Sequence, residues 1–151
     1  MNHTFFIGDI SENPTYDYRV YGNRTADVSL HDDVFAYIHD SINWVVSFNP
    51  AIRMAPHTGL FLTGVTVLKS SGARNLFEIS KAWSSLFKQS PSKLRLTGGF
   101  RHIEGDSNTA GWYEKLVFDR GNIIEDFDLL ASLCLEVAES SDTAFVMHYG
   151  L

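Results

Sequence analysis

The clearest pattern of apolar and polar positions lies between Gly111 and Ser140. Gly111–Phe118 is predicted to be a strand, followed by a sharp turn. Asn122 is the predicted N-cap of a long helix, with Glu125 placed close to a capping box. Apolar side chains then recur at helical spacing and form a wide stripe: Ile123, Phe127, Leu130, Cys134 and Val137, flanked by Leu129, Leu133 and Leu135. This segment is therefore predicted to be the main scaffold of the fold.

The middle of the chain begins with a strand and a helix. Leu60–Leu68 is rich in β-branched residues and is predicted to be a buried strand. Ala73–Gln89 is predicted to be an amphipathic helix. Its basic ridge, opposite the apolar face, consists of Arg74, Lys81 and Lys88.

The segment Lys93–Arg101 alternates between apolar and polar side chains, as a half-buried strand does. Its apolar side is predicted to hold Leu94, Leu96 and Phe100. Its polar side is predicted to hold Lys93, Arg95, Thr97 and Arg101. Gly98-Gly99 inside this strand predicts a bulge or a close backbone approach. His102–Ala110 is predicted to be a polar loop, and Thr143–Tyr149 is predicted to be the last strand.

The N-terminal region is predicted to contain three elements: strand Thr4–Ile10, strand Tyr16–Tyr21 and a helix over about Leu30–Asn43. Ser29 is the predicted N-cap of that helix, with Asp32 and Asp33 in its first turn, where carboxylates favour the helix dipole. Trp44–Phe48 is compatible with a strand or with a continued helix. Asn49-Pro50 and Ala55-Pro56 bracket a predicted loop.

This order of elements predicts an α+β fold: a mostly antiparallel sheet with two or three helices packed on it. Residues 60–149 follow the order strand–helix–strand–strand–helix–strand, which is that of a ferredoxin-like unit. The N-terminal residues would extend the sheet or cover its free face. A generic α+β sheet with helices on one face is the alternative, and residues 1–151 are predicted to form a single domain.

Composition excludes several classes of protein. A hydrophobic fraction of 44% and a charged fraction of 20% are those of an ordinary globular protein. No apolar window approaches the length of a membrane span, and the N-terminus has no basic start, so a cytoplasmic protein is expected. Cys134 is the single cysteine, which excludes an internal disulfide and a cysteine-cluster metal site. Because it lies on the core side of its helix, it is predicted to be an inert packing residue.

The net charge of −6 is unevenly distributed along the chain. Residues 1–50 carry seven acidic and two basic side chains, residues 51–101 one acidic and eight basic, and residues 102–151 ten acidic and two basic. Such a layout indicates either complementary charges between packed elements or separate surface patches.

No catalytic, phosphate-binding or metal-binding motif occurs in the sequence, so no cofactor and no metal are expected. His57, His102 and His148 are the only candidates for acid–base chemistry, and ordinary surface or capping histidines are the simpler interpretation. Lys93, Arg95 and Arg101 are the one feature that favours nucleic-acid binding, and the overall acidity opposes it.

The strand–turn–helix YEKLVFDRGNIIEDFDLLASLCLEVAES and its acidic ridge, within a small acidic α+β chain, resemble the immunity proteins of bacterial toxin systems. These include the immunity proteins of contact-dependent growth inhibition and of colicin-like nucleases. The resemblance implies a non-enzymatic protein that binds a cognate, usually basic, toxin domain and occludes its active site. A carboxylate cluster would steer association with such a partner, and a few aromatic anchors would supply affinity.

Three acidic sets are the candidate partner contacts. The sets are Asp27, Asp32, Asp33 and Asp40; Glu104 and Asp106; and Glu125, Asp128, Glu136 and Glu139. Each set is equally compatible with a solvated surface. The alternative function is a small enzyme or ligand-binding module with a cleft near His57, His102 and His148.

Overall fold

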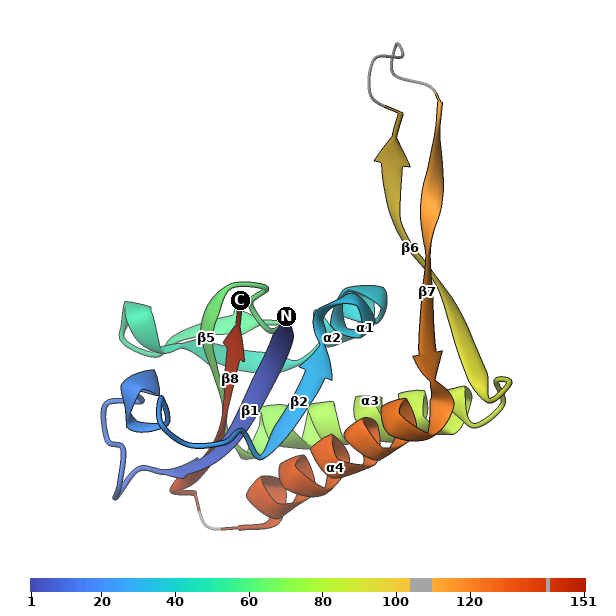
Figure 1. Cartoon of the computed structure of the whole chain (residues 1–151). Coiled ribbons are helices and arrows are strands. Elements are labelled where there is room, and N and C mark those ends of the chain that lie inside the picture. Colours follow the sequence, from blue (N-terminus) through green and yellow to red (C-terminus); the bar gives the residue numbers. More distant parts are fainter. Residues whose placement is uncertain (104–109, 141) are drawn as a thin grey trace.

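An antiparallel six-stranded sheet forms the centre of the described chain, which comprises residues 1–103, 110–140 and 142–151 of a computed structural model (Figure 1). In sheet order its strands are β2 (Val28–His31), β1 (Asn2–Asp9), β8 (Ala144–Gly150), β5 (Gly64–Leu68), β3 (Val46–Asn49) and β4 (Ala55–Thr58). Each neighbouring pair of strands is antiparallel. The predicted α+β class is confirmed.

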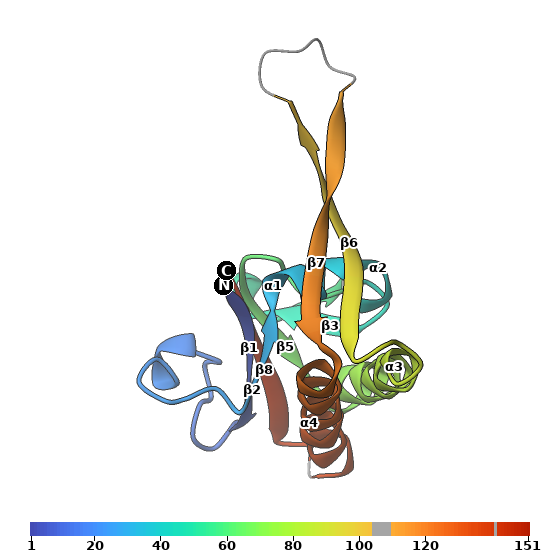
Figure 2. The same ribbon diagram turned by 45° about the vertical axis from the view of Figure 1, so that its right-hand side comes forward.

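Two long helices cover one face of this sheet and pack against each other (Figures 1 and 2). They are α3 (Ser70–Phe87) and α4 (Arg120–Glu139), and they bury Leu76, Phe127 and Leu130 completely against the strands. Both helices were indicated by the apolar periodicity. α3 begins earlier than the predicted Ala73, and Gly72 in its first turn lies close to β3: a Cβ at Gly72 would lie 2.0 Å from the Val46 carbonyl oxygen.

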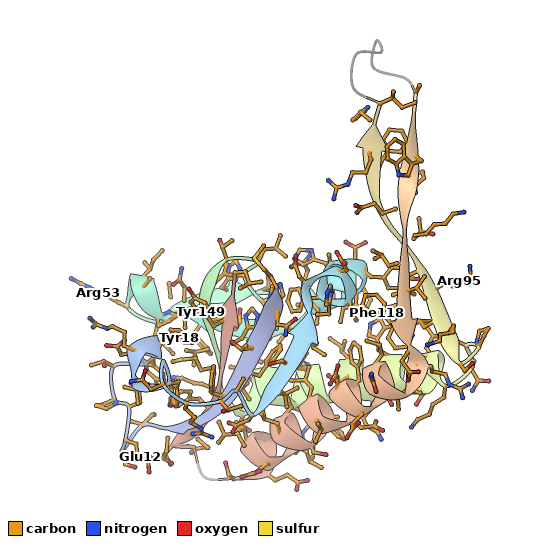
Figure 3. All side chains as sticks on the ribbon, in the orientation of Figure 1. Glu12, Tyr18, Arg53, Arg95, Phe118 and Tyr149 are labelled. Carbon is orange, nitrogen blue, oxygen red and sulfur yellow. The ribbon has the colours of Figure 1, made fainter. Side chains whose placement is uncertain are left out.

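The other face of the sheet is covered by residues 10–27 (Figure 2). Tyr18 and Tyr149 stack with ring centroids 4.0 Å apart (Figure 3). The N-terminal region thus extends the sheet through β1 and β2 and also covers its free face, as expected. The predicted strand Tyr16–Tyr21 is wrong: this segment holds the short 3-10 helix η1 (Tyr18–Val20). Asp17 caps η1 by accepting the backbone N–H of Arg19, and such local bonds compete with strand pairing.

The remaining two strands, β6 (Lys93–His102) and β7 (Gly111–Asp119), pair only with each other. The ferredoxin-like arrangement is therefore wrong, although the order of elements was right. Its physical reason is the occupancy of the sheet: β1 and β3 already pair with the outer edges of β8 and β5. The β6–β7 hairpin has no central edge to join, and it leaves the body as a separate ribbon (Figures 1 and 2).

The predicted helix starts are displaced at two places. Ser29 lies inside β2, and His31 is the N-cap of α1 (Asp32–Tyr37), accepting the backbone N–H of Asp33 at 3.2 Å. The cap of α4 is Asp119, which accepts the N–H groups of Gly121 and Asn122, so Asn122 is already helical and Glu125 forms no capping box with it. Asp32 and Asp33 do lie in the first turn of α1, as predicted.

Three short elements between α1 and β5 were not predicted from the pattern of apolar and polar residues. α2 (His39–Ile42) follows α1 after a break at Ile38, so the predicted continuous helix is divided. η2 (Pro50–Ile52) lies in the predicted loop, and β4 begins at the end of that loop. The predicted strand Leu60–Leu68 begins only at Gly64.

Candidate interaction surface

The ribbon is the feature of the fold that the core does not explain. Near the body, Leu94 and Leu96 are buried, and Leu116 and Phe118 pack against the same core cluster (Figure 3). Farther out, none of the described ribbon residues is buried. A two-stranded hairpin alone is marginally stable in water, so the outer half has little to hold it except its own pairing.

A β-bulge at Gly98-Gly99 determines which side chains share a face of the ribbon. Thr97 pairs with Lys115, and the next pair is Phe100 with Tyr113, so β6 has one residue more than β7 in this interval. The bulge was predicted, but its effect on the faces was not. Beyond it, Phe100 lies on the face of Lys115 and Tyr113.

The predicted assignment of Phe100 to the apolar side of β6, and of Arg101 to its polar side, is therefore wrong. Arg101 pairs with Trp112 on the opposite face, and its Nε donates to Glu114 Oε1 at 2.8 Å. Arg95 points outward near the base of the ribbon, as Figure 3 shows. The three basic residues that favoured nucleic-acid binding do not form one continuous face.

Three aromatic side chains, which we name the ring group, are exposed on the outer ribbon: Phe100, Trp112 and Tyr113. Trp112 is 56% exposed and Tyr113 60% exposed. The rings of Phe100 and Tyr113 meet edge to face at 5.1 Å. Large aromatic side chains dominate binding energy where they are buried by a partner, so this group has the composition of an interface centre.

The N-terminal acidic set lies partly beside the base of the ribbon. Asp33 lines a hollow of about 370 Å³ together with residues of β6 and β7. Asp32 accepts a hydrogen bond from His3 at 3.1 Å, and Asp40 is exposed on α2. Asp27 serves the fold instead, because it accepts the backbone N–H of Ile7 and pairs with Arg24.

Two of the four acidic residues of the α4 set, Asp128 and Glu139, face basic residues of the α3 ridge, as one of the two predicted interpretations required. Asp128 accepts a 2.6 Å hydrogen bond from Ser84, which lowers the pKa of its carboxyl group, and lies 3.7 Å from Lys88. Glu139 lies 4.0 Å from Arg74.

The remaining members of the predicted acidic sets have different positions. Glu125 and Glu136 are exposed and form no ion pair with another described residue. Glu104 and Asp106 lie outside the described residues.

The three candidate histidines are not brought together. His57 stacks on Phe61 at the sheet edge, His102 lies on the ribbon, and His148 is completely buried in β8. Their separation gives no histidine-lined cleft.

His148 instead contacts His3, which was not among the predicted candidates for acid–base chemistry. His3 Nδ1 lies 2.9 Å from His148 Nε2, and His3 Nε2 lies 3.1 Å from Asp32 Oδ1. Phe35 stacks on His3 at 3.7 Å. Burial lowers the pKa of His148 well below its usual value and also lowers the pKa of His3, against the opposing effect of Asp32.

This histidine network is structural in character. Neither ring is exposed, whereas a general base must reach the proton that it removes. The network joins β1, β8 and α1, and only the strand register brings its members together. No group of three metal-ligating side chains occurs among the described residues. Burial also raises the pKa of the Cys134 thiol, in agreement with its predicted inert role.

None of the described helices is long and apolar enough to cross a membrane. Comparison with known proteins gives no match to this chain, whether with family models, with curated proteins or with solved structures.

Proposed function

We propose that this protein is a non-enzymatic binding protein that neutralises a cognate toxin domain, as the immunity proteins do that its C-terminal segment resembles. The observation that carries the proposal is the ribbon with its exposed ring group. A projecting ribbon can enter a concave site on a partner that a flat surface cannot reach. Aromatic anchors at such a position supply most of the affinity of an interface.

The charges beside the ribbon support a basic partner. Asp33 and Asp40 lie on α1 and α2, and α1 packs against β6 at the base of the ribbon. Carboxylates at the border of an interface increase the association rate of a basic partner. The N-terminal acidic set is therefore the proposed contact surface for the partner. The α4 set is less suitable, because its Asp128 and Glu139 already face basic residues of α3.

The direct test takes the product of the neighbouring upstream gene as the candidate toxin. Cells that express its C-terminal domain should grow when this protein is co-expressed and should stop growing without it. The purified pair should bind with one-to-one stoichiometry in isothermal titration calorimetry.

The ring group is tested by the double variant Trp112→Ala/Tyr113→Ala. Loss of two anchors should weaken binding by at least about 30-fold, which corresponds to about 2 kcal/mol. Trp44→Ala is the matched control, because Trp44 is 71% exposed but lies on the body between α2 and β3. Unchanged binding by the double variant would remove the ribbon from the interface. Failure of the wild type to protect or bind would overturn the proposed function itself.

A further inference from the structure

A hollow of about 370 Å³ separates α1 from the bulge of the ribbon. Asp33 and Tyr37 line it from α1, and Gly98, Gly99 and Leu116 line it from the ribbon. It therefore lies between the two parts of the proposed interface, at the point where the ribbon leaves the body.

The Asp33 carboxylate brings negative charge to this hollow. Its side chain is 44% exposed, and its nearest histidine does not neutralise it. His31 Nδ1 lies 3.6 Å from Asp33 Oδ2, but the same nitrogen accepts the backbone N–H of Asp33 and so carries no proton to share.

The second acidic side chain near the hollow already has a partner. Glu114 lies next to Gly99 and binds the guanidinium of Arg101. The hydrogen bond with Glu114 is the main cause that raises the pKa of Arg101, and attraction to Asp33 contributes least. Arg101 is thus bound by Glu114, and among the described residues it forms no ion pair with Asp33.

The two glycines of the bulge differ in what the fold requires of them. A Cβ at Gly98 would lie only 3.0 Å from Glu114 Cβ and 3.1 Å from Leu116 Cγ, so a side chain there would require these neighbours to shift by a few tenths of an ångström. A Cβ at Gly99 would meet nothing closer than Glu114 Oε2 at 3.8 Å, and Gly99 does not have a positive φ. The fold therefore does not require glycine at position 99. Because Gly99 lines the hollow and has no side chain, it leaves the hollow open.

The walls of the hollow suit a planar cation. Tyr37 is 44% exposed and is held edge to face against Trp83 at 5.9 Å. An aromatic ring and a carboxylate on one hollow bind a guanidinium through a cation–π contact and charge-assisted hydrogen bonds. Arginine is preferred to lysine at such a site because its flat group can stack on the ring while it bonds the carboxylate.

We propose that this hollow is a subsite for an arginine side chain of the protein partner, a role that rests on the proposed function. The ring group would anchor the partner on the ribbon, and Asp33 would fix its orientation through one arginine. The basic character expected of the partner supplies such a side chain.

The subsite can be tested without the partner, with N-acetyl-arginine amide as the probe. Amide resonances of Asp33, Tyr37, Gly98 and Gly99 in two-dimensional NMR spectra should shift and saturate as the probe is added. N-acetyl-norleucine amide has a similar length but no charge, and it should bind at least about tenfold more weakly.

Three variants separate the subsite from general electrostatics. Asp33→Asn should weaken the arginine probe about tenfold, and Gly99→Leu should abolish binding by filling the hollow while the thermal unfolding midpoint stays unchanged. Asp40→Asn removes the same charge from an exposed site outside the hollow and should leave binding intact. Equal binding of norleucine, an equal effect of Asp40→Asn, or no saturable shift would each overturn the subsite.

The two proposals fail in different experiments. Loss of growth protection by the ring-group variant concerns the proposed function and uses no amino-acid probe. If the wild type neutralises its toxin and the probe does not bind, the subsite is wrong and the function stands.

Discussion

The His148–His3–Asp32 network assigns a single tautomer to each of its rings. His3 Nε2 donates to Asp32, so His3 Nδ1 must accept a hydrogen from His148 Nε2. His148 Nδ1 is then the unprotonated nitrogen, and it is buried without a hydrogen-bond partner in the part of the chain that the structure describes. A proton added to His3 would reverse its bond to His148 and leave a buried N–H of His148 unpaired.

The network predicts that stability falls in mild acid. Both histidines have a lowered pKa in the folded state, whereas the unfolded chain takes up protons near a pKa of about 6.5. Their contribution is complete above that pH and is lost as the pH falls below it. Each histidine that stays neutral should lower the free energy of unfolding by up to about 1.4 kcal/mol per pH unit. Urea unfolding between pH 7.5 and pH 5 measures this slope.

The variant His148→Leu identifies the source of the slope. It should reduce stability at neutral pH by about 1 kcal/mol, because His3 loses its donor, and it should flatten the pH dependence. His57→Leu is the control, since His57 is exposed on β4. If both variants keep the slope of the wild type, other groups cause the loss of stability in acid.

Among single elements, the contact between α3 and α4 includes a buried hydrogen bond. Ser84 is fully buried and donates to Asp128 at 2.6 Å. Ser84→Ala should destabilise the protein by about 1 to 2 kcal/mol, because a hydrogen bond to a charged acceptor is lost. Ser85→Ala, at the exposed neighbouring position of the same helix, should change stability by less than about 0.5 kcal/mol. Chemical denaturation of both variants measures the difference.

The outer ribbon is expected to be dispensable for folding. A shortened chain, in which Asn-Gly joins Thr97 directly to its pairing partner Lys115, keeps the buried Leu94 and Leu96 and removes the ring group. Its thermal unfolding midpoint should remain within about 3 °C of that of the wild type, which corresponds to less than about 1 kcal/mol. A much larger decrease, measured by circular dichroism, would mean that the outer ribbon stabilises the body.

The elements that periodicity predicted are those in which local sequence and burial agree. α3 and α4 have apolar stripes that pack on the sheet, and β8 has a run of residues buried on both faces. The cap of α4 was misplaced because Asp119 and Asn122 are both good N-caps, and the strand continues directly into the helix. Local sequence alone could not decide between them.

The relations between distant segments could not be predicted. The pairing of β1 with β8 separates the hairpin from the sheet and also brings His3 to His148, and neither contact has a local signal. One extra residue in a strand reverses every later side chain, so the bulge moved Phe100 and Arg101 to faces opposite those predicted.

At the scale of the whole molecule, the acidic surfaces should differ in their effect on association. Asp40→Lys changes the charge on α2, which follows α1 at the base of the ribbon, and Glu136→Lys makes the same change on α4. The first should lower the association rate with the basic partner several-fold and weaken its salt dependence, because steering acts near the interface. Glu136→Lys should have little effect. Stopped-flow measurements at two salt concentrations would refute this placement if Glu136→Lys had the larger effect.

The separation of the ribbon from the core has a consequence for how this protein can evolve. Substitutions at Phe100, Trp112 or Tyr113 change no buried contact of the body, so they are almost free of the folding penalty that limits changes in a core. Substitutions in the outer ribbon can therefore accumulate under selection for partner binding alone. Related chains should retain the sheet and helices, while their ribbons diverge in sequence.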